Sequence, residues 1–159
     1  MTEKNGAAGR DDFNPADCAA IRNVIGAYAH YLDANKIDDL LSLFLDDAIF
    51  EVHEPDREPR VINKEQLSVA TKQRFAGFAK LKNQRRHLMA GVFFESLTED
   101  AAHAFCEMLV CGTRSGTELV PACTGEYEGW FRKTQGVWKI SHWIDKIDSR
   151  PEPVVIGEE

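Results

Sequence analysis

The chain has 159 residues, of which 43% are hydrophobic and 28% charged, and its formal net charge is −7 at pH 7. This length and balance are typical of one globular domain with a sizeable core. The negative charge argues against binding along a nucleic-acid backbone, which requires clustered cations. The sequence contains no run of about 20 apolar residues, so no membrane span is predicted. Residues 1–12 are polar and lack the apolar centre of a signal peptide, so we expect a cytoplasmic protein.

The chain begins with a segment, residues 1–13, that is small, polar and without periodicity, and we expect it to be disordered. A helix is then predicted, with Asn14 as its N-cap, Pro15 at its first position and Asp17 near the positive end of the helix dipole. Apolar residues recur along it at 3.6-residue spacing. A second, short helix is expected to follow, with Asp38 as its cap.

The next part of the chain predicts one strand and a third helix. The strand covers residues 48–54, and Pro55 and Pro59 then bracket a loop. Asn63 and Gln66 have the spacing of a capping box, which predicts a helix that runs to about residue 79.

The second half of the chain predicts long strands separated by short turns. These strands cover residues 85–97, 101–113, 118–133 and 137–148. Short turns join antiparallel neighbours, so we expect a meander. Three helices followed by a long antiparallel sheet indicate an α+β fold. Strands of this length curl, and we expect a cone-shaped curved sheet closed by the three helices, in one domain over residues 14–148 with a tail at 149–159.

Alternation along the strands predicts which side chains face inward. In residues 101–113 the even positions are all apolar and mostly small, which suits a core or a pocket wall. The odd positions include Phe105 and Leu109, which predict an oligomer surface together with Trp143 of the last strand. The same alternation places His142 among large apolar side chains, on the face opposite Trp143.

Four cysteines lie outside any metal-binding or redox spacing, at positions 18, 106, 111 and 123. None forms a Cys-x-x-Cys pair, and none sits beside a histidine at metal-ligand spacing. We therefore expect reduced packing residues and no metal site.

Asp33 and His87 are the most informative pair in the chain. Asp33 ends the first predicted helix, and His87 opens the strand at residues 85–97. A carboxylate can orient an imidazole and hold its proton, which gives a general acid and base that works near neutral pH. A carboxylate at a helix C-terminus opposes the helix dipole, which favours a specific partner for Asp33. The function depends on whether the two side chains meet.

The sequence motifs around this pair resemble those of a known family. Tyr-x-x-x-x-Asp at residues 28–33, followed by Asp-x-Leu-x-x-Leu-Phe-x-Asp-Asp-Ala at 38–48, resembles the SnoaL-like branch of the nuclear-transport-factor-2-like superfamily. The last hairpin, residues 129–140, supports the likeness, which spans roughly residues 14–148. It implies a cystatin-like or nuclear-transport-factor-2-like α+β barrel. It identifies the activity poorly, because this fold hosts dehydratases, isomerases, cyclases and non-catalytic subunits.

Within that superfamily the residues look most like scytalone dehydratase and bile-acid dehydratase. In both, a carboxylate at the end of the first helix orients a histidine at the start of a long strand, and Asp33 and His87 match those positions. Tyr28 matches a tyrosine that serves the bile-acid enzyme. The resemblance thus implies that Asp33, His87 and Tyr28 are catalytic.

The departures from these enzymes concern the helper groups. The second histidine of scytalone dehydratase falls on Gly112, its first-strand tyrosine on Val52 and its pocket asparagine on Tyr127. Ketosteroid isomerase places its catalytic base at the Val52 position, so we do not expect steroid isomerisation of that kind. The dyad remains while its helpers are replaced, which leaves both substrate and chemistry open.

The resemblance implies a cofactor-independent dehydratase or isomerase that acts on a hydroxylated aromatic, polyketide or steroid-like molecule. His87 would take a carbon-bound proton, Asp33 would fix the tautomer of His87, and Tyr28 would donate a hydrogen bond to the substrate. The expected substrate-binding residues are Tyr31, Val52, Met89, Met108, Val110, Tyr127, Trp130 and His142.

Two other functions stay open at this point. The chain could be a non-catalytic subunit like the small subunit of ring-hydroxylating dioxygenases, or a protein that binds an apolar ligand. We expect a homodimer or homotrimer in every case. A scaffold would not need Asp33 and His87 to converge, whereas an enzyme would.

Overall fold

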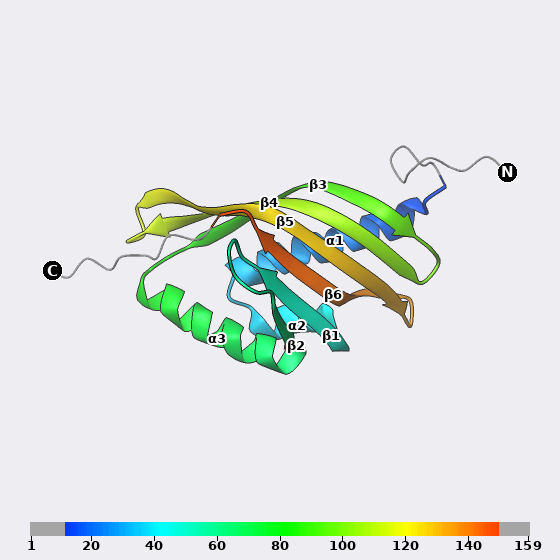
Figure 1. Ribbon diagram of the computed structural model, residues 1–159, viewed down its shortest axis with the longest axis horizontal. Coiled ribbons are helices and arrows are strands. Elements are labelled where there is room, and N and C mark those ends of the chain that lie inside the picture. The colour runs from blue at the N-terminus through cyan, green and yellow to red at the C-terminus, as the bar shows by residue number, and fades with distance from the viewer. Residues whose placement is uncertain (1–11, 150–159) are drawn as a thin grey trace.

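The structure, a computed structural model, describes residues 12–149 (Figure 1). The terminal tails expected at 1–13 and 149–159 lie almost wholly outside these residues. The helices are α1 (Pro15–Asp33), α2 (Ile37–Ser42) and α3 (Lys64–Lys80). The strands are β1 (Phe44–His53), β2 (Arg60–Asn63), β3 (Arg85–Leu97), β4 (Ala101–Arg114), β5 (Glu118–Thr134) and β6 (Val137–Ile147).

The strands form one curled sheet in the order β2-β1-β6-β5-β4-β3. The meander of β3 to β6 is antiparallel throughout, as predicted. The expectation of a wholly antiparallel sheet is wrong at β1, which lies parallel to β6. The short strand β2, which the sequence did not predict, pairs with β1 along the outer edge.

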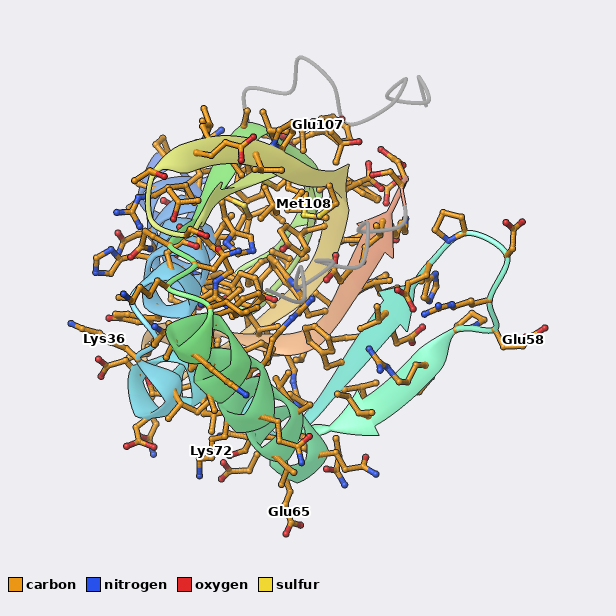
Figure 2. The ribbon with its side chains drawn as sticks, turned by 90° about the vertical axis from the view of Figure 1, so that its left-hand side faces the viewer. Lys36, Glu58, Glu65, Lys72, Glu107 and Met108 are labelled. Carbon is orange, nitrogen blue, oxygen red and sulfur yellow. The ribbon has the colours of Figure 1, made fainter. Side chains whose placement is uncertain are left out.

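The helices lie on the concave side of the sheet. Figure 1 shows α1 running behind the strands and α3 beside the β1–β2 end. Figure 2 looks along the curl, and the neighbouring residues Glu107 and Met108 of β4 point to opposite sides of the sheet. Met108 is buried and Glu107 is exposed, so the interior of the curl is the core. The α+β fold with a curved sheet and three helices is therefore confirmed.

The ends of the helices follow the predicted capping chemistry at two of three places. The Asn14 side chain accepts hydrogen bonds from the backbone N–H groups at the start of α1, at 2.9 and 3.3 Å. Asn63 and Gln66 form a reciprocal capping box at the start of α3. The expected cap of α2 is wrong, because Asp38 lies inside that helix and Lys36 occupies the N-cap position without a side-chain hydrogen bond.

The predicted inner face of β4 is confirmed. Its even-numbered side chains are buried against the helices: Ala102, Ala104, Cys106, Met108 and Val110. From α1, Ile21, Ile25 and Tyr28 pack into the same core. The core therefore forms between α1 and the concave face of the sheet.

The faces of β6 differ from the predicted alternation. Trp138 and Ile140 are buried as expected, but the next inward residues are Trp143 and Asp145. The pairing of β5 with β6 shifts register between residues 130 and 131, and an extra residue in a strand exchanges the faces that follow it. Trp143 is 1% exposed, so its expected place on an oligomer surface is wrong. His142 faces the convex side instead.

Two broader expectations concern the class of the protein. None of the helices within residues 12–149 is long and apolar enough to cross a membrane. The four cysteines are free, and Cys18 and Cys106 are buried. The cytoplasmic location stays a prediction.

A close approach of β5 to β6 predicts a strong effect of one glycine. A Cβ at Gly125 would press against the Lys146 carbonyl oxygen and lie 2.8 Å from Met108 Cε. We expect Gly125→Ala to lower the free energy of unfolding by about 1–3 kcal/mol in urea titrations, because the backbone must shift.

Gly77→Ala is the matched control, since a Cβ there meets no atom within 4 Å. Within the interior of α3 this change should raise stability by roughly 0.5–1 kcal/mol. Equal stability of the two variants would contradict the packing at Gly125.

Candidate active site

The Asp33 carboxylate and the His87 ring are in direct contact. Asp33 Oδ1 lies 2.6 Å from His87 Nδ1, and Oδ2 accepts a hydrogen bond of 2.9 Å from the backbone N–H of His87. Each side chain is 11% exposed. Because a carboxylate only accepts hydrogen bonds, Nδ1 carries the proton and Nε2 is left to act on a substrate. One carboxylate thus sets both the position and the tautomer of the histidine.

The C-terminal end of α1 is fixed to the start of β3 by further bonds. Arg85 Nη2 donates to the Leu32 carbonyl oxygen at 2.8 Å and to Asn35 Oδ1 at 2.7 Å. Gln84 Nε2 donates to the Asp33 carbonyl oxygen at 3.0 Å. Burial lowers the pKa of Arg85 to about 10, so it stays charged at neutral pH. A cation at the C-terminal carbonyl groups is favourable for the helix dipole and compensates for Asp33 there.

Two buried tyrosines lie on the same concave side. Tyr28 is 3% exposed and Tyr127 is 2% exposed, and their rings meet edge to face with centroids 5.5 Å apart. Trp143 packs against both. Burial raises the pKa of both tyrosines above its usual value, and the charge of Asp145 raises that of Tyr28 further. Both hydroxyl groups therefore stay protonated and can donate hydrogen bonds.

Asp145 belongs to this group of residues, although the sequence did not single it out. It lies on β6, directly opposite Val52 of β1 and Tyr127 of β5 in the sheet register, and it is 8% exposed. Burial raises its pKa from 3.8 to about 6, while the positive charges of Arg74 and His87 lower it. Its Oδ1 has no hydrogen-bond partner among residues 12–149.

A signal for Asp145 was present in the sequence but was assigned to the wrong surface. Strand alternation places Asp145 on the same face as Trp143, and a carboxylate beside a large apolar residue is a candidate site residue. That face was expected to be an oligomer surface, because the shift of register in β6 cannot be seen in the alternation. The structure turns both side chains toward Tyr28.

Most of the expected substrate-binding residues lie on the concave side with the dyad. Those buried in the core cluster are Val52, Met108, Val110 and Tyr127, and those partly buried against it are Tyr31 and Met89. His87 and Met89 belong to β3 and pair with Val110 and Met108 of β4. Aliphatic and thioether side chains therefore lie beside His87 on the same face of the sheet.

Trp130 and His142 do not lie with the others, and their expected inward orientation is wrong. The Trp130 ring stacks between His103 and His142 on the convex face, with centroids 4.3 and 4.7 Å away. His142 Nε2 lies 2.8 Å from Glu51 Oε1. The alternation of β5, in which Tyr127 and Phe131 face inward, turns Trp130 outward. A surface hollow of about 260 Å³ beside Trp130 and His103 is separate from the dyad.

Residues 12–149 contain no group of three or more histidine, cysteine or acidic side chains that could hold a metal ion.

Comparisons with known proteins agree with this architecture. A family model described as a SnoaL-like domain matches residues 16–144. The β subunit of a putative aromatic-ring-hydroxylating dioxygenase from Novosphingobium aromaticivorans is similar over 89% of this chain and 97% of its own, with 20% identity and a TM-score of 0.70. A putative scytalone dehydratase from the same organism is similar over 90% of this chain and 96% of its own, with 17% identity and a TM-score of 0.68. No curated protein sequence matches the chain.

A third solved structure is named for the fold that the sequence predicted. An NTF2-like protein with a cystatin-like fold, also from Novosphingobium aromaticivorans, is similar over 84% of this chain and 82% of its own. The identity is 18% and the TM-score is 0.70. Likenesses at this level of identity concern the fold alone, and the predicted fold is confirmed.

The burial of Asp145 predicts an unusual dependence of stability on pH. The native state binds the Asp145 proton more tightly than the unfolded chain, so stability is lost as pH rises from about 4 to 6. The difference between 3.8 and about 6 corresponds to roughly 3 kcal/mol. We therefore expect Asp145→Asn to unfold at higher urea than the wild-type protein at pH 8, with the advantage shrinking as the pH falls from about 6 to about 4.

Asp148→Asn is the control, because Asp148 is exposed just beyond β6. It should leave the stability curve almost unchanged. An Asp145→Asn variant that is less stable than wild type at pH 8 would show that the carboxylate is held by partners rather than destabilised by burial.

Proposed function

The chain belongs to the family of SnoaL-like domains, and on that premise we propose that it is a cofactor-independent dehydratase or isomerase. Its substrate would be a hydroxylated aromatic, polyketide or steroid-like molecule. The observation that carries the proposal is the contact of 2.6 Å between Asp33 and His87, both of which are only 11% exposed. A carboxylate-oriented imidazole whose Nε2 is left to act is suited to moving protons.

The proposed reaction begins with a proton next to a carbonyl group. His87 Nε2 takes this proton from carbon, and Asp33 stabilises the imidazolium that forms. Negative charge then develops on the carbonyl oxygen, where Tyr28 or Tyr127 donates a hydrogen bond. Loss of the β-hydroxyl group completes dehydration. Return of the proton to a different carbon would instead give isomerisation.

The surroundings of the dyad suit an apolar substrate. Val52, Met108 and Val110 are buried in the same cluster as Tyr28. Few polar groups and many apolar ones are typical of sites for small organic molecules. Because low polarity strengthens hydrogen bonds to a developing charge, the two tyrosine hydroxyls would act most strongly there.

A second candidate function is that of a non-catalytic subunit. The likeness to a dioxygenase β subunit, which covers 97% of that protein, favours it. In such a subunit the Asp33–His87 contact would serve only to fasten α1 to β3. A subunit should co-purify with a larger catalytic chain, whereas the proposed enzyme should be active without one. A protein that merely binds an apolar ligand would show neither property.

The catalytic proposal predicts a large effect of His87→Gln. We would incubate the purified protein with a panel of cyclic and aromatic β-hydroxy ketones and follow loss of water by mass spectrometry. Removal of the proton-transfer group should lower kcat by about 10²–10⁴-fold. Asp33→Asn should lower it in the same direction, because the imidazole loses its orientation.

His30→Gln provides the matched control, since His30 is an exposed histidine of α1. Its activity should equal that of the wild-type protein. The proposal fails if no member of the panel is dehydrated, or if His87→Gln is as active as His30→Gln.

We also propose that the chain forms a homo-oligomer through the convex face of the sheet. Leu88 pairs with Leu109, and Phe93 pairs with Phe105, across β3 and β4. Leu88, Leu109 and Phe93 are 53%, 39% and 41% exposed. These apolar pairs form a strip on one face, with the exposed Glu107 between Leu109 and Phe105 on β4. An exposed apolar surface of this kind is typical of one that another protein covers. A second copy would bury the strip symmetrically.

The oligomer proposal predicts that Leu109→Arg produces a monomer in size-exclusion chromatography with light scattering, because an unpaired charge in an apolar interface is unfavourable. Leu119→Arg is the control, since Leu119 is 72% exposed near the β4–β5 turn. A wild-type protein that is already monomeric, or a Leu109→Arg variant with unchanged mass, would contradict this interface.

A further inference from the structure

We infer that Asp145 is the second proton-transfer group of this site, the acid that protonates the departing hydroxyl group while His87 takes the proton from carbon. The inference rests on the proposed function and adds a residue that the family resemblance does not supply. It assigns different tasks to the two carboxylates on the concave side of the sheet.

The position of Asp145 places it among the groups of the proposed reaction. Val52 on one side and Tyr127 on the other are its direct neighbours across the sheet. Tyr127 in turn contacts Tyr28. The charges of Asp145 and of His87 interact, and so do those of Asp145 and Tyr28. The acid, the base and the two hydroxyl donors thus share one side of the sheet.

The hydrogen bonding of the two carboxylates differs. Both oxygens of Asp33 are bonded, one to the ring and one to the backbone N–H of His87. Asp145 Oδ1 has no partner among the described residues, although the residue is 8% exposed. A buried polar atom without a partner is costly, and such atoms gather at sites where a ligand completes the bonding. Asp33 is therefore bonded within the protein, whereas Asp145 is left to bond a ligand and to donate a proton to it.

The charges around Asp145 come from several elements. Burial raises its pKa most, to about 6, which is close to a working pH and therefore suited to acid–base catalysis. The groups that act on it or lie beside it are Tyr28 of α1, Arg74 of α3, Glu54 just after β1, Arg60 of β2, His87 of β3, and Cys123 and Tyr127 of β5. Arg74, His87 and Arg60 favour the carboxylate, and Glu54 favours the protonated acid.

His87 and Asp145 together complete one reaction cycle. In the active form His87 is neutral and Asp145 carries the proton. The C–H bond breaks and its proton passes to His87 Nε2, while the electron pair forms the new carbon–carbon double bond. The C–O bond breaks, the oxygen takes the proton of Asp145, and water leaves. The imidazolium then releases its proton to solvent and the Asp145 carboxylate takes one up from solvent, so the protons balance and no oxidant is required.

Two titratable groups in different surroundings commonly divide acid and base tasks in this way. His87 alone would have to carry the proton from carbon to oxygen and would need to reach both atoms in turn. A separate acid on β6 removes this requirement, because β6 is separated from β3 in the sheet by β5 and β4.

The test compares two leaving groups. We would take the β-hydroxy ketone of the panel that the wild-type protein dehydrates fastest, together with its β-fluoro counterpart, and measure kcat and KM for Asp145→Asn and His87→Gln. Fluoride can leave without being protonated, whereas the hydroxyl group must be protonated so that it leaves as water. We expect Asp145→Asn to lower kcat by about 10²-fold or more for the hydroxy ketone and by less than about threefold for the fluoro ketone.

The remaining outcomes separate the inference from the proposed function. His87→Gln should be slow with both substrates, because both reactions require loss of the carbon-bound proton. The kcat of the wild-type protein with the hydroxy ketone should fall above pH of about 6, and this fall should be absent in Asp145→Asn. Equal losses for both substrates in Asp145→Asn, with His87→Gln inactive, would overturn the inference and leave the proposed function standing. If no panel ketone loses water, both fail.

Discussion

The site depends on the two hydrogen bonds between the Asp33 carboxylate and His87. These bonds join Asp33, the last residue of α1, to His87 near the start of β3, 54 residues further along the chain. Both carboxylate oxygens are used, so the ring and the backbone of the histidine are held together. Arg85 fastens the same junction through the carbonyl oxygen of Leu32. The position of the histidine is therefore set by the packing of α1 into the curled sheet, and not by a flexible loop.

The interior of the curl controls which groups keep their protons. Tyr28 and Tyr127 remain hydroxyl donors because burial disfavours their ionised forms. The same burial acts on Asp145, which has no partner for one of its oxygens among the described residues. Asp33 differs because His87 satisfies it from two directions. The two carboxylates thus lie in one apolar environment but differ in their hydrogen bonding. The missing hydrogen bond at Asp145 lowers the stability of the fold, and a cost of this kind is typical of functional sites.

Local signals in the sequence predicted the parts of the fold that local physics decides. The cap at Asn14, the capping box at Asn63 and the alternation of β4 are confirmed because each depends on residues close in sequence. The parallel pairing of β1 with β6 depends on a distant strand and was missed. The shift of register in β6 adds a single residue, which exchanged the faces of His142 and Trp143. Asp145 was overlooked for the same reason. The contact between Asp33 and His87 was implied by the resemblance to the family and is present in the structure.

Exchange of a carbon-bound hydrogen is the most direct test of the central claim, that His87 moves a proton from carbon. A ketone from the β-hydroxy series, prepared without its hydroxyl group, would be incubated with the protein in D₂O and followed by NMR. Because no leaving group is present, only proton removal and return can occur. The account predicts that the wild-type protein incorporates deuterium next to the carbonyl group and that His87→Gln does so no faster than buffer. Exchange at the buffer rate with the wild-type protein, or equally fast exchange with the variant, would contradict it.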